Sequence, residues 1–319
     1  MTKFEKEDLG KKAKALGFSR DPYEKVCRLV KILGILEGDQ LLGNTLALKG
    51  GTAINLLIFN DLPRLSVDID LDYVVNVSRE ELDGSKLAIS DLIGKYMHND
   101  GYVESNKSRN SHSLISSAYI YNNSAGANDN IRIEINYLLR AHILPTEKRN
   151  SCSDHVLGDF SIRSLSEHEI FASKIVALLN RGAARDLYDT YRMVVSGIFD
   201  KSQIPFLRKC VVFYDAISGG LITDKNPMRW KGQINSRKIK TDLTPMLRRT
   251  DDFEFRHAVA DVESYLSELL NLGYEERSFI ESFRRKDYRP ELLFDNPEII
   301  DRIKYHPMAI WRTSKERTL

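Results

Sequence analysis

The order of apolar and polar residues along the chain predicts helices, then a mixed region, then helices again. Residues 4–39 contain two segments with the apolar period of amphipathic helices. Residues 46–75 read as strand, helix and strand, and Ser78 and Glu81 then have the spacing of a capping box at the start of another helix. Further strand-like runs lie near residues 102–105, 113–121 and 130–138. Beyond Ser166 the pattern is helical only.

This pattern predicts an α+β fold, in which a mixed β-sheet with flanking helices is followed by a helical C-terminal domain. We expect the sheet domain over residues 1–160 and the helical domain over residues 161–319. With 319 residues, 42% of them hydrophobic, the chain can bury the core of one large or two medium domains. No apolar run approaches the roughly 18 residues of a membrane span, and the charged N-terminus is unlike a signal peptide. We therefore expect a cytoplasmic protein without a membrane partner.

Composition argues against several kinds of site. Cys27, Cys152 and Cys210 are scattered without zinc-site spacing, which favours packing residues in a reducing compartment. The seven histidines are dispersed, and we interpret them as structural. A net charge of +2 gives the whole chain no attraction for nucleic acid, so any such contact must come from local patches.

Acidic residues alternate with apolar ones from Ser66 to Asp72. Strict alternation over seven residues is typical of a half-buried strand, which places Asp68, Asp70 and Asp72 on one face. Asp is disfavoured in strands, and neighbouring carboxylates repel unless a cation lies between them. A lone Asp-x-Asp is common in loops, but three acids within an apolar strand favour a Mg²⁺ site.

A glycine turn precedes the acidic strand. The apolar run 46–48 leads into Gly50-Gly51 and then into a short helix that we expect to begin near Thr52. Such a turn offers backbone N–H groups and the positive end of a helix to phosphate. Gly-Gly alone is a common turn, yet a phosphate-binding turn followed by metal-binding acids is the layout of a nucleotidyltransferase.

A second alternating strand carries another candidate acid. Arg132, Glu134 and Asn136 share one face of residues 131–136. Two-metal transfer commonly needs a further carboxylate for the second metal, and Glu134 is the candidate. The alternative is a solvent-facing glutamate on an edge strand.

The helix that follows Ser166 combines a capping signal with a lysine among apolar residues. Ser166 is the expected N-cap, and Glu169 has the capping-box position. One narrow arc of this helix holds Glu167, Phe171, Lys174, Leu178 and Arg181. A lysine in such a place either extends its ammonium group to solvent or points at an anion, and both interpretations remain open.

Basic residues recur among aromatic ones in the C-terminal half. They lie at Arg229 and Lys231, at Arg237, Lys238 and Lys240, at Arg248 and Arg249, at Arg284, Arg285 and Lys286, and at Arg312. With Trp230, Tyr288 and Trp311 available for stacking, they suit a groove for a phosphate backbone. Charge runs are also common on solvated helices, and nearby acids dilute the positive charge.

These motifs together resemble the AbiEii/AbiGii-type toxin nucleotidyltransferases, a group that includes the MenT toxins. The resemblance covers roughly residues 30–295. The matching motifs are Lys49-Gly50-Gly51-Thr52-Ala53 with the stretch from Arg64 to Asp70, then Ile133-Glu134-Ile135, then Glu167 with Lys174, Ala177, Leu178 and Arg181, and finally Arg185-Asp186-Leu187-Tyr188-Asp189.

The resemblance implies a Mg²⁺-dependent nucleotidyltransferase that acts as the toxin of a phage-defence toxin–antitoxin system, with a cognate antitoxin encoded nearby. It implies metal binding by Asp68, Asp70 and Glu134, with two ions expected and Mn²⁺ as the alternative to Mg²⁺. The NTP contacts that it implies are Gly50, Gly51, Thr52, Arg64, Ser66 and Lys174. Asp186 would position Lys174 or touch the substrate, and the choice of Asp186 over Asp189 stays open.

By the same resemblance, the acceptor is the 3′ end of tRNA, whose extension blocks charging and arrests growth. Two alternatives remain. One is an enzyme of the same chemistry that modifies a protein hydroxyl, and the other is a nucleotide-binding regulator without transfer.

Overall fold

The computed structural model describes residues 5–59, 61–151, 160–220, 222 and 226–314. Packing divides the chain into two compact units. The first unit consists of Met1–Arg140, Thr146–Leu165 and Pro245–Asp251, and the second of Ala141–Pro145, Ser166–Thr244 and Asp252–Leu319. The α+β class with a mixed sheet is confirmed. The domain division at residue 160 stays a prediction, and Cys152 and His155 lie outside the described residues.

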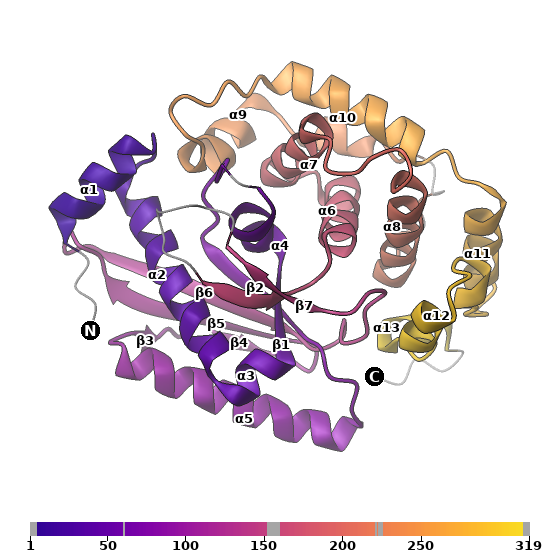
Figure 1. The fold of residues 1–319 in the computed structure, drawn as a ribbon, viewed down its shortest axis with the longest axis horizontal. Coiled ribbons are helices and arrows are strands. Elements are labelled where there is room, and N and C mark those ends of the chain that lie inside the picture. The colour runs from indigo at the N-terminus through magenta and orange to yellow at the C-terminus, as the bar shows by residue number, and fades with distance from the viewer. Residues whose placement is uncertain (1–4, 60, 152–159, 221, 223–225, 315–319) are drawn as a thin grey trace. The chain divides into compact units, whose positions relative to one another are not determined.

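The first unit holds the strands and the helices that pack on them (Figure 1). Its helices are α1 (Lys6–Ala15), α2 (Arg20–Gly38), α3 (Gln40–Thr45), α4 (Gly50–Ala53), which continues into the π-helical turn η1 (Ile54–Ile58), and α5 (Arg79–Asn99). Its strands are β1 (Leu46–Lys49), β2 (Asp68–Tyr73), β3 (Val103–Glu104), β4 (Arg109–Asn110), β5 (Leu114–Asn122), β6 (Asn128–Asn136), β7 (Glu147–Asn150) and β8 (Ser161–Ser164).

These strands form one mixed sheet in the order β3-β5-β6-β2-β1-β8-β7, with β4 also paired to β5. Strand β2 runs parallel to β6 and antiparallel to β1, and β1 runs parallel to β8. The register of the parallel pair sets Asp68 opposite Arg132 and Asp70 opposite Glu134. The two segments with alternating acids are therefore neighbours at the centre of the sheet.

The two faces of the sheet differ as the alternation predicts. The apolar face carries Ile69 and Leu71 of β2 and Ile133 of β6, all buried. Helices α2 and α5 cover this face, because Arg28 of α2 lies over the Tyr121 ring and Lys86 of α5 lies over the Tyr137 ring (Figure 1). The predicted capping box of α5 is confirmed. The opposite face carries the carboxylates and contacts α4.

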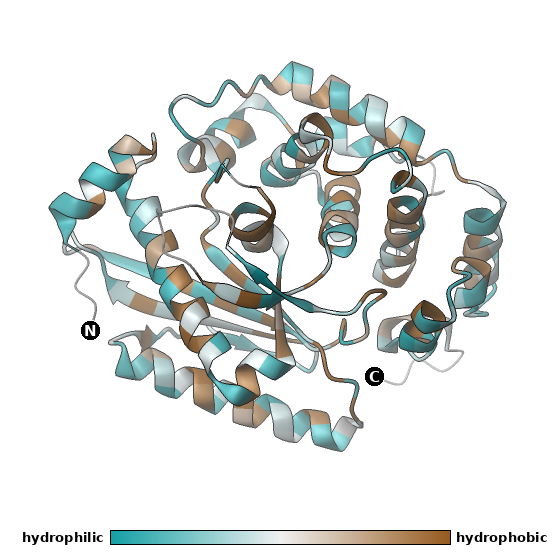
Figure 2. Cartoon of the chain, viewed as in Figure 1, coloured by the Kyte–Doolittle hydropathy of each residue, from teal (hydrophilic) through white to brown (hydrophobic). Residues whose placement is uncertain are grey.

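Strands β7 and β8 have no counterpart among the sequence expectations. Both are four residues long, and β7 reads Glu-Lys-Arg-Asn without apolar alternation. Figure 2 shows β7 as hydrophilic. Strand β7 ends the sheet, and charges on an edge strand oppose pairing with another chain.

The second unit is helical. Its longer helices are α6 (Glu167–Arg181), α7 (Ala184–Ser196), α8 (Ile204–Ser218), α10 (Phe255–Leu269) and α11 (Tyr274–Arg284). Shorter elements are η2 (Arg229–Gln233), α9 (Ser236–Lys238), η3 (Ile239–Leu243), η5 (Pro290–Leu292), α12 (Pro297–Ile303) and α13 (Pro307–Thr313), and η4 (Thr244–Met246) leads back to the first unit. Helices α6, α7, α8 and α10 pack together, and Figure 2 shows α8 as largely hydrophobic, in keeping with its buried residues from Cys210 to Ile217.

None of the helices that the structure describes is long and apolar enough to cross a membrane.

Candidate active site

The Gly50-Gly51 turn packs directly on the acidic strand. Gly50 has a φ of +68°, and a Cβ atom there would overlap the carboxylate of Asp70. A Cβ atom on Gly51 would lie 2.5 Å from Arg64 Nη2 and 3.0 Å from Ser66 Oγ. Both positions therefore need glycine, which lets the backbone at the start of α4 approach these side chains.

Thr52 and Ser66 join α4 to the strand that carries the acids. The Thr52 hydroxyl donates to the backbone oxygen of Asp68 at 2.5 Å and lies 3.0 Å from Ser66 Oγ. Thr52 is fully buried, so its hydroxyl serves the packing of α4 on β2. The helix begins at Gly50, two residues before the expected start.

Arg64 is a buried cation beside the glycine turn. Its side chain is 2% exposed, and Nη1 donates to the Leu65 oxygen at 3.0 Å. Its backbone pairs with Leu247, and its N–H donates to Asn55 Oδ1 at 3.3 Å. These contacts fix the guanidinium against Gly51, so a positive charge is built into the turn.

The three acids of β2 are not equivalent. Asp68 and Asp70 are partly exposed, whereas Asp72 is 1% exposed and pairs with Lys49 Nζ at 2.5 Å. Burial raises the pKa of Asp72 to about 6, although Lys49 lowers it, and the nearby Asp70 raises it further. Asp68 and Asp70 are therefore the accessible carboxylates of this strand.

Glu134 lies on a central strand, because β6 is paired on both sides with β5 and β2. The edge-strand alternative for this residue is therefore wrong. Its Oε1 accepts a hydrogen bond from Ser116 Oγ at 2.8 Å and lies 3.8 Å from Arg132 Nη1. Strands in a sheet lie about 4.8 Å apart, so the register places the Glu134 backbone next to that of Asp70.

The donors on this face suit a hard cation, because carboxylate oxygens are the ligands that Mg²⁺ and Mn²⁺ prefer. Asp68, Asp70 and Glu134 lie on the same face of two paired strands. In the described parts of the chain, no group of three or more His, Cys, Asp or Glu side chains has an arrangement that could hold a metal ion. The fit therefore rests on the chemistry of the donors and the register of their strands.

In the second unit, Lys174 points at anions. It is 9% exposed, and its ammonium group lies 2.9 Å from Asp186 Oδ1 and 3.1 Å from Asp189 Oδ2. The alternative in which Lys174 extends to solvent is therefore wrong. Both acids of the Arg-Asp-x-Tyr-Asp element contact the lysine.

Asp186 is held ionised by two cations. Its carboxylate also accepts hydrogen bonds from Arg181 Nε at 2.7 Å and Nη2 at 3.1 Å. Burial alone would raise the pKa of Asp186, but the charges and hydrogen bonds of Lys174 and Arg181 outweigh it and lower the pKa to about 2. Together, Lys174, Arg181, Asp186 and Asp189 have no net formal charge.

Glu169 has a role that the sequence analysis missed. Ser166 caps α6 as expected, accepting from the Glu169 N–H at 3.3 Å. The Glu169 carboxylate is buried and accepts from Ile143 N at 2.8 Å and from the Tyr214 hydroxyl at 2.7 Å. A signal was available, since Glu169 precedes Ala172, Val176 and Leu179 on the buried stripe of α6. It holds the segment 141–145 to α6 and α8.

The basic residues of the C-terminal half differ in availability. Arg237 and Lys240 are exposed, whereas Lys231 forms an ion pair with Glu263. Lys238 donates to the Gln233 oxygen at 2.6 Å. The expectation that Trp230 is available for stacking is wrong, because this side chain is fully buried. Arg248 belongs to the first unit, where it lies over the Phe18 ring.

Comparisons with known proteins identify the family and the fold. No curated protein matches the chain. Among solved structures, it is similar to MenT4, a nucleotidyltransferase toxin from Mycobacterium tuberculosis H37Rv, with a TM-score of 0.62 and 16% identity over 87% of this chain and 94% of MenT4. A family model described as nucleotidyl transferase AbiEii toxin, type IV toxin–antitoxin system, matches residues 34–284, which include all the candidate site residues. The chain belongs to the AbiEii family of nucleotidyltransferase toxins.

Proposed function

We propose that this nucleotidyltransferase toxin transfers a nucleotide from an NTP to the 3′ acceptor end of tRNA and thereby arrests translation and growth. The observation that carries the proposal is the packing of Gly50 on Asp70, because it puts a turn suited to phosphate against an accessible carboxylate. Family membership supports an NTP substrate and a cognate antitoxin.

In this proposal the first unit binds the triphosphate and the metal. The backbone N–H groups of Gly50, Gly51 and Thr52 face the phosphates. The side chains of Arg64 and Ser66 lie against Gly51 and hold the turn in position. Asp68, Asp70 and Glu134 are the proposed metal ligands. Bound Mg²⁺ or Mn²⁺ would stabilise negative charge on the entering and leaving oxygens.

The second unit supplies positive charge held in a fixed position. Lys174 neutralises charge on the phosphates, and Asp186 and Asp189 are positioning residues that fix its ammonium group. A cation that is already oriented costs little reorganisation when charge develops during transfer. Asp186 is ionised over the physiological pH range because its pKa is depressed.

Exposed cations on α9 and η3 support tRNA as the acceptor. Arg237 and Lys240 are free to meet a phosphate backbone, and the chain as a whole is nearly neutral. A local basic patch gives salt-dependent binding through counterion release.

The decisive experiment incubates the purified full chain with each labelled NTP and total tRNA or a protein extract, with Mg²⁺, Mn²⁺ or excess EDTA. We expect label on tRNA that is lost with EDTA. Periodate-oxidised tRNA, which lacks the terminal ribose hydroxyls, is the matched control and should stay unlabelled. Label on protein would support transfer to a protein hydroxyl instead, and no transfer with any NTP or acceptor would support a regulator.

A further inference from the structure

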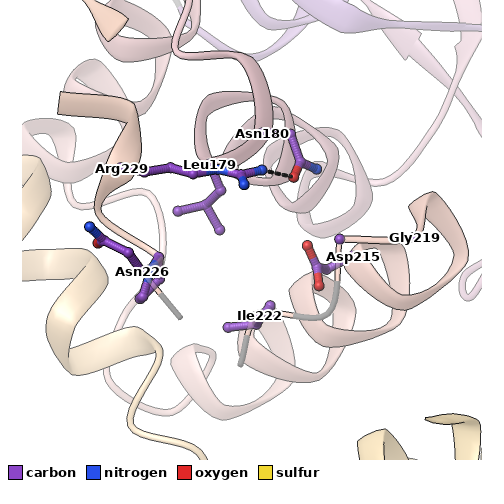
Figure 3. Close-up of a pocket in the computed structure, with 9 residues that line it drawn as sticks. Leu179, Asn180, Asp215, Gly219, Ile222, Asn226 and Arg229 are labelled. Carbon is purple, nitrogen blue, oxygen red and sulfur yellow. Dashed lines mark hydrogen bonds between the residues drawn. The ribbon is translucent and has the colours of Figure 1, made fainter. Parts of the chain in front are cut away.

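A cavity of about 130 Å³ lies in the second unit, between the C-terminal ends of α6 and α8 and the residues before η2 (Figure 3). The proposed transfer reaction uses none of the residues that line it. The volume is well below the roughly 300 Å³ at which pockets for drug-sized ligands begin, so it limits an occupant to a single small ring system or a fragment of similar size.

A buried carboxylate lies at one side of this cavity. Asp215 is 3% exposed, and its Oδ2 accepts no hydrogen bond from any described residue. An ionised carboxylate only accepts hydrogen bonds, and leaving a buried acceptor unsatisfied destabilises the fold. Burial raises the pKa of Asp215 to about 6, even though a hydrogen bond from the Ile222 backbone and the Arg229 charge lower it. The group is therefore mostly ionised at neutral pH, and its Oδ2 has no donor among the described residues.

A second acceptor lies beside the first. A Cβ atom on Gly220 would overlap Asp215 Oδ1 and would lie 3.0 Å from Asn180 Oδ1, so both oxygens approach the same glycine. Figure 3 shows the Asp215 and Asn180 side chains on the same side of the cavity. This side of the cavity therefore suits a ligand edge that carries more than one N–H donor.

The remaining lining supplies a donor group and an apolar wall. The Arg229 guanidinium lies 3.5 Å from Asn180 Oδ1 through Nη2 and has further N–H groups to donate. Its charge balances that of Asp215, which favours a neutral ligand over an isolated ion. Leu179 and Ile222 also line the cavity and suit the face of a flat ring.

We propose that this cavity binds a guanine base. Guanine is neutral and planar, and it presents N1–H and N2–H₂ as adjacent donors on one edge and O6 and N7 as acceptors on another. Asp215 accepts from the donor edge, and Arg229 donates to the acceptor edge, the pairing by which arginine reads guanine in DNA. No other common base has two adjacent donor groups on one edge. The base can belong to a free guanine nucleotide or to a guanosine in RNA.

The test measures binding of guanosine, inosine, adenosine and xanthosine to the metal-free full chain by calorimetry. We expect saturable guanosine binding that weakens for inosine, which lacks the N2 amino group, and is absent for adenosine. Equal binding of guanosine and adenosine, or no guanosine binding, would overturn the proposal. Because neither metal nor acceptor is present, a negative result leaves the transfer reaction unaffected.

A substitution that exchanges an acceptor for a donor sharpens the test. Asp215→Asn should weaken the affinity for guanosine about 10- to 100-fold, the scale of a lost hydrogen bond to a charged group. It should strengthen the affinity for xanthosine, whose O2 can accept a hydrogen bond from the new amide. Asp295→Asn is the matched control, because it makes the same change at an exposed residue of the same unit. If Asp215→Asn fails to fold, Gly220→Ala takes its place and should abolish guanosine binding by filling the acceptor side. Unchanged guanosine affinity in a folded variant would contradict the assignment.

Two further arms identify the source of the base. GMP and a short single-stranded RNA with one guanosine compete against bound guanosine, and the same RNA with adenosine in its place is the control. If only GMP competes, the ligand of the cavity is a free guanine nucleotide. If the guanosine RNA competes at a lower concentration than GMP, the ligand is a guanosine in RNA. If neither competes, the cavity does not accept a guanine that carries a phosphate, and the proposal is wrong.

Discussion

Single side chains decide which acids can act in this protein. Asp68 and Asp70 are accessible, whereas Asp72, two residues further along the same face, is buried against Lys49. The alternation of the sequence predicted the shared face. It could not predict this difference, because the partner lies on another strand, β1, and the burial comes from packing.

Asp68→Asn should reduce transfer at least about 100-fold, more than a change outside the metal ligands typically causes, because it removes negative charge that the cation needs. Stability should change by no more than about 0.5 kcal/mol, since the side chain is partly exposed. Labelled-NTP transfer, growth arrest and a urea unfolding curve provide the measurements. Asp91→Asn, at an exposed position of the same unit, is the control and should remain active. A folded Asp68→Asn protein that still arrests growth would refute the metal assignment.

Lys174→Ala should lower transfer about 10- to 1,000-fold, the scale of losing one group that stabilises developing charge. It should also cost about 3–5 kcal/mol of stability, because Asp186 and Asp189 lose a buried partner. Transfer is therefore measured under conditions where melting curves show the variant folded. Lys201→Ala, an exposed lysine of the same unit, is the control. Full activity in folded Lys174→Ala would leave the lysine a structural role only.

The depressed pKa of Asp186 predicts acid sensitivity. A carboxyl with a folded-state pKa of about 2 and an ordinary value of 3.8 stabilises the fold fully above pH 3.8, and that contribution is lost as the pH falls towards 2. The loss is on the order of 2 kcal/mol. Unfolding free energies of the protein and of Asp186→Asn, measured in urea from pH 5 to 2.5, should therefore converge as the pH falls. A constant difference across that range would mean that Asp186 is not held in the ionised state.

At the level of elements, the sequence predicts those that have a clear period and misses those that depend on distant partners. Strand β6 and the capped helices α5 and α6 appear where the alternation and the caps place them. Strands β7 and β8 are short and lack apolar alternation, and they exist because they pair with each other and with β1.

The candidate site follows the same division. The acids on β2 and β6 were recognisable because both strands alternate, and their pairing in register follows from strand geometry only once the two are neighbours. Lys174 was recognisable as unusual, but its partners belong to the next helix, and helical periodicity says nothing about contacts between helices. The buried state of Trp230 likewise depends on packing that no local pattern reveals.

The exposed cations of α9 and η3 give a prediction at this scale. Replacing Arg237, Lys238 and Lys240 together by Glu should raise the apparent KM for tRNA and should lower the salt dependence of binding by about one unit of slope per lost phosphate contact. Nucleotide binding should be unchanged. The control replaces Lys6, Lys11 and Lys14 of α1 by Glu. These lysines are exposed too, and the net charge changes by the same amount. If the triple variant labels tRNA as well as the unsubstituted protein does, with no partner present, these three residues do not bind tRNA.

In the whole molecule, the two units are interleaved in sequence. The first unit takes residues 146–165 after the chain has entered the second, and it takes residues 245–251 much later. Strand β8 lies just beyond residue 160 and pairs with both β1 and β7, while Leu247 pairs with Arg64. A single cut near residue 160 therefore removes parts of the sheet unit.

A fragment of residues 1–160 should accordingly lack cooperative unfolding, whereas the full chain should unfold with a clear transition. Circular dichroism during a urea titration makes the comparison. A fragment of residues 1–165, which restores β8, should recover part of the sheet signal. Cooperative unfolding of the 1–160 fragment would show that β8 and residues 245–251 are dispensable for this unit.

The fit of Gly50 against Asp70 also has a genetic consequence. Every change at the first or second base of a glycine codon gives a stop codon or a residue with a Cβ atom, and none of those residues can be accommodated at position 50 without displacing the carboxylate. Expression of a toxin without its antitoxin selects for mutations that inactivate the toxin. Codon 50 should therefore be among the places where missense escape mutations accumulate, whereas missense changes at codon 84, whose glycine has open space around it, should not be enriched by the same selection.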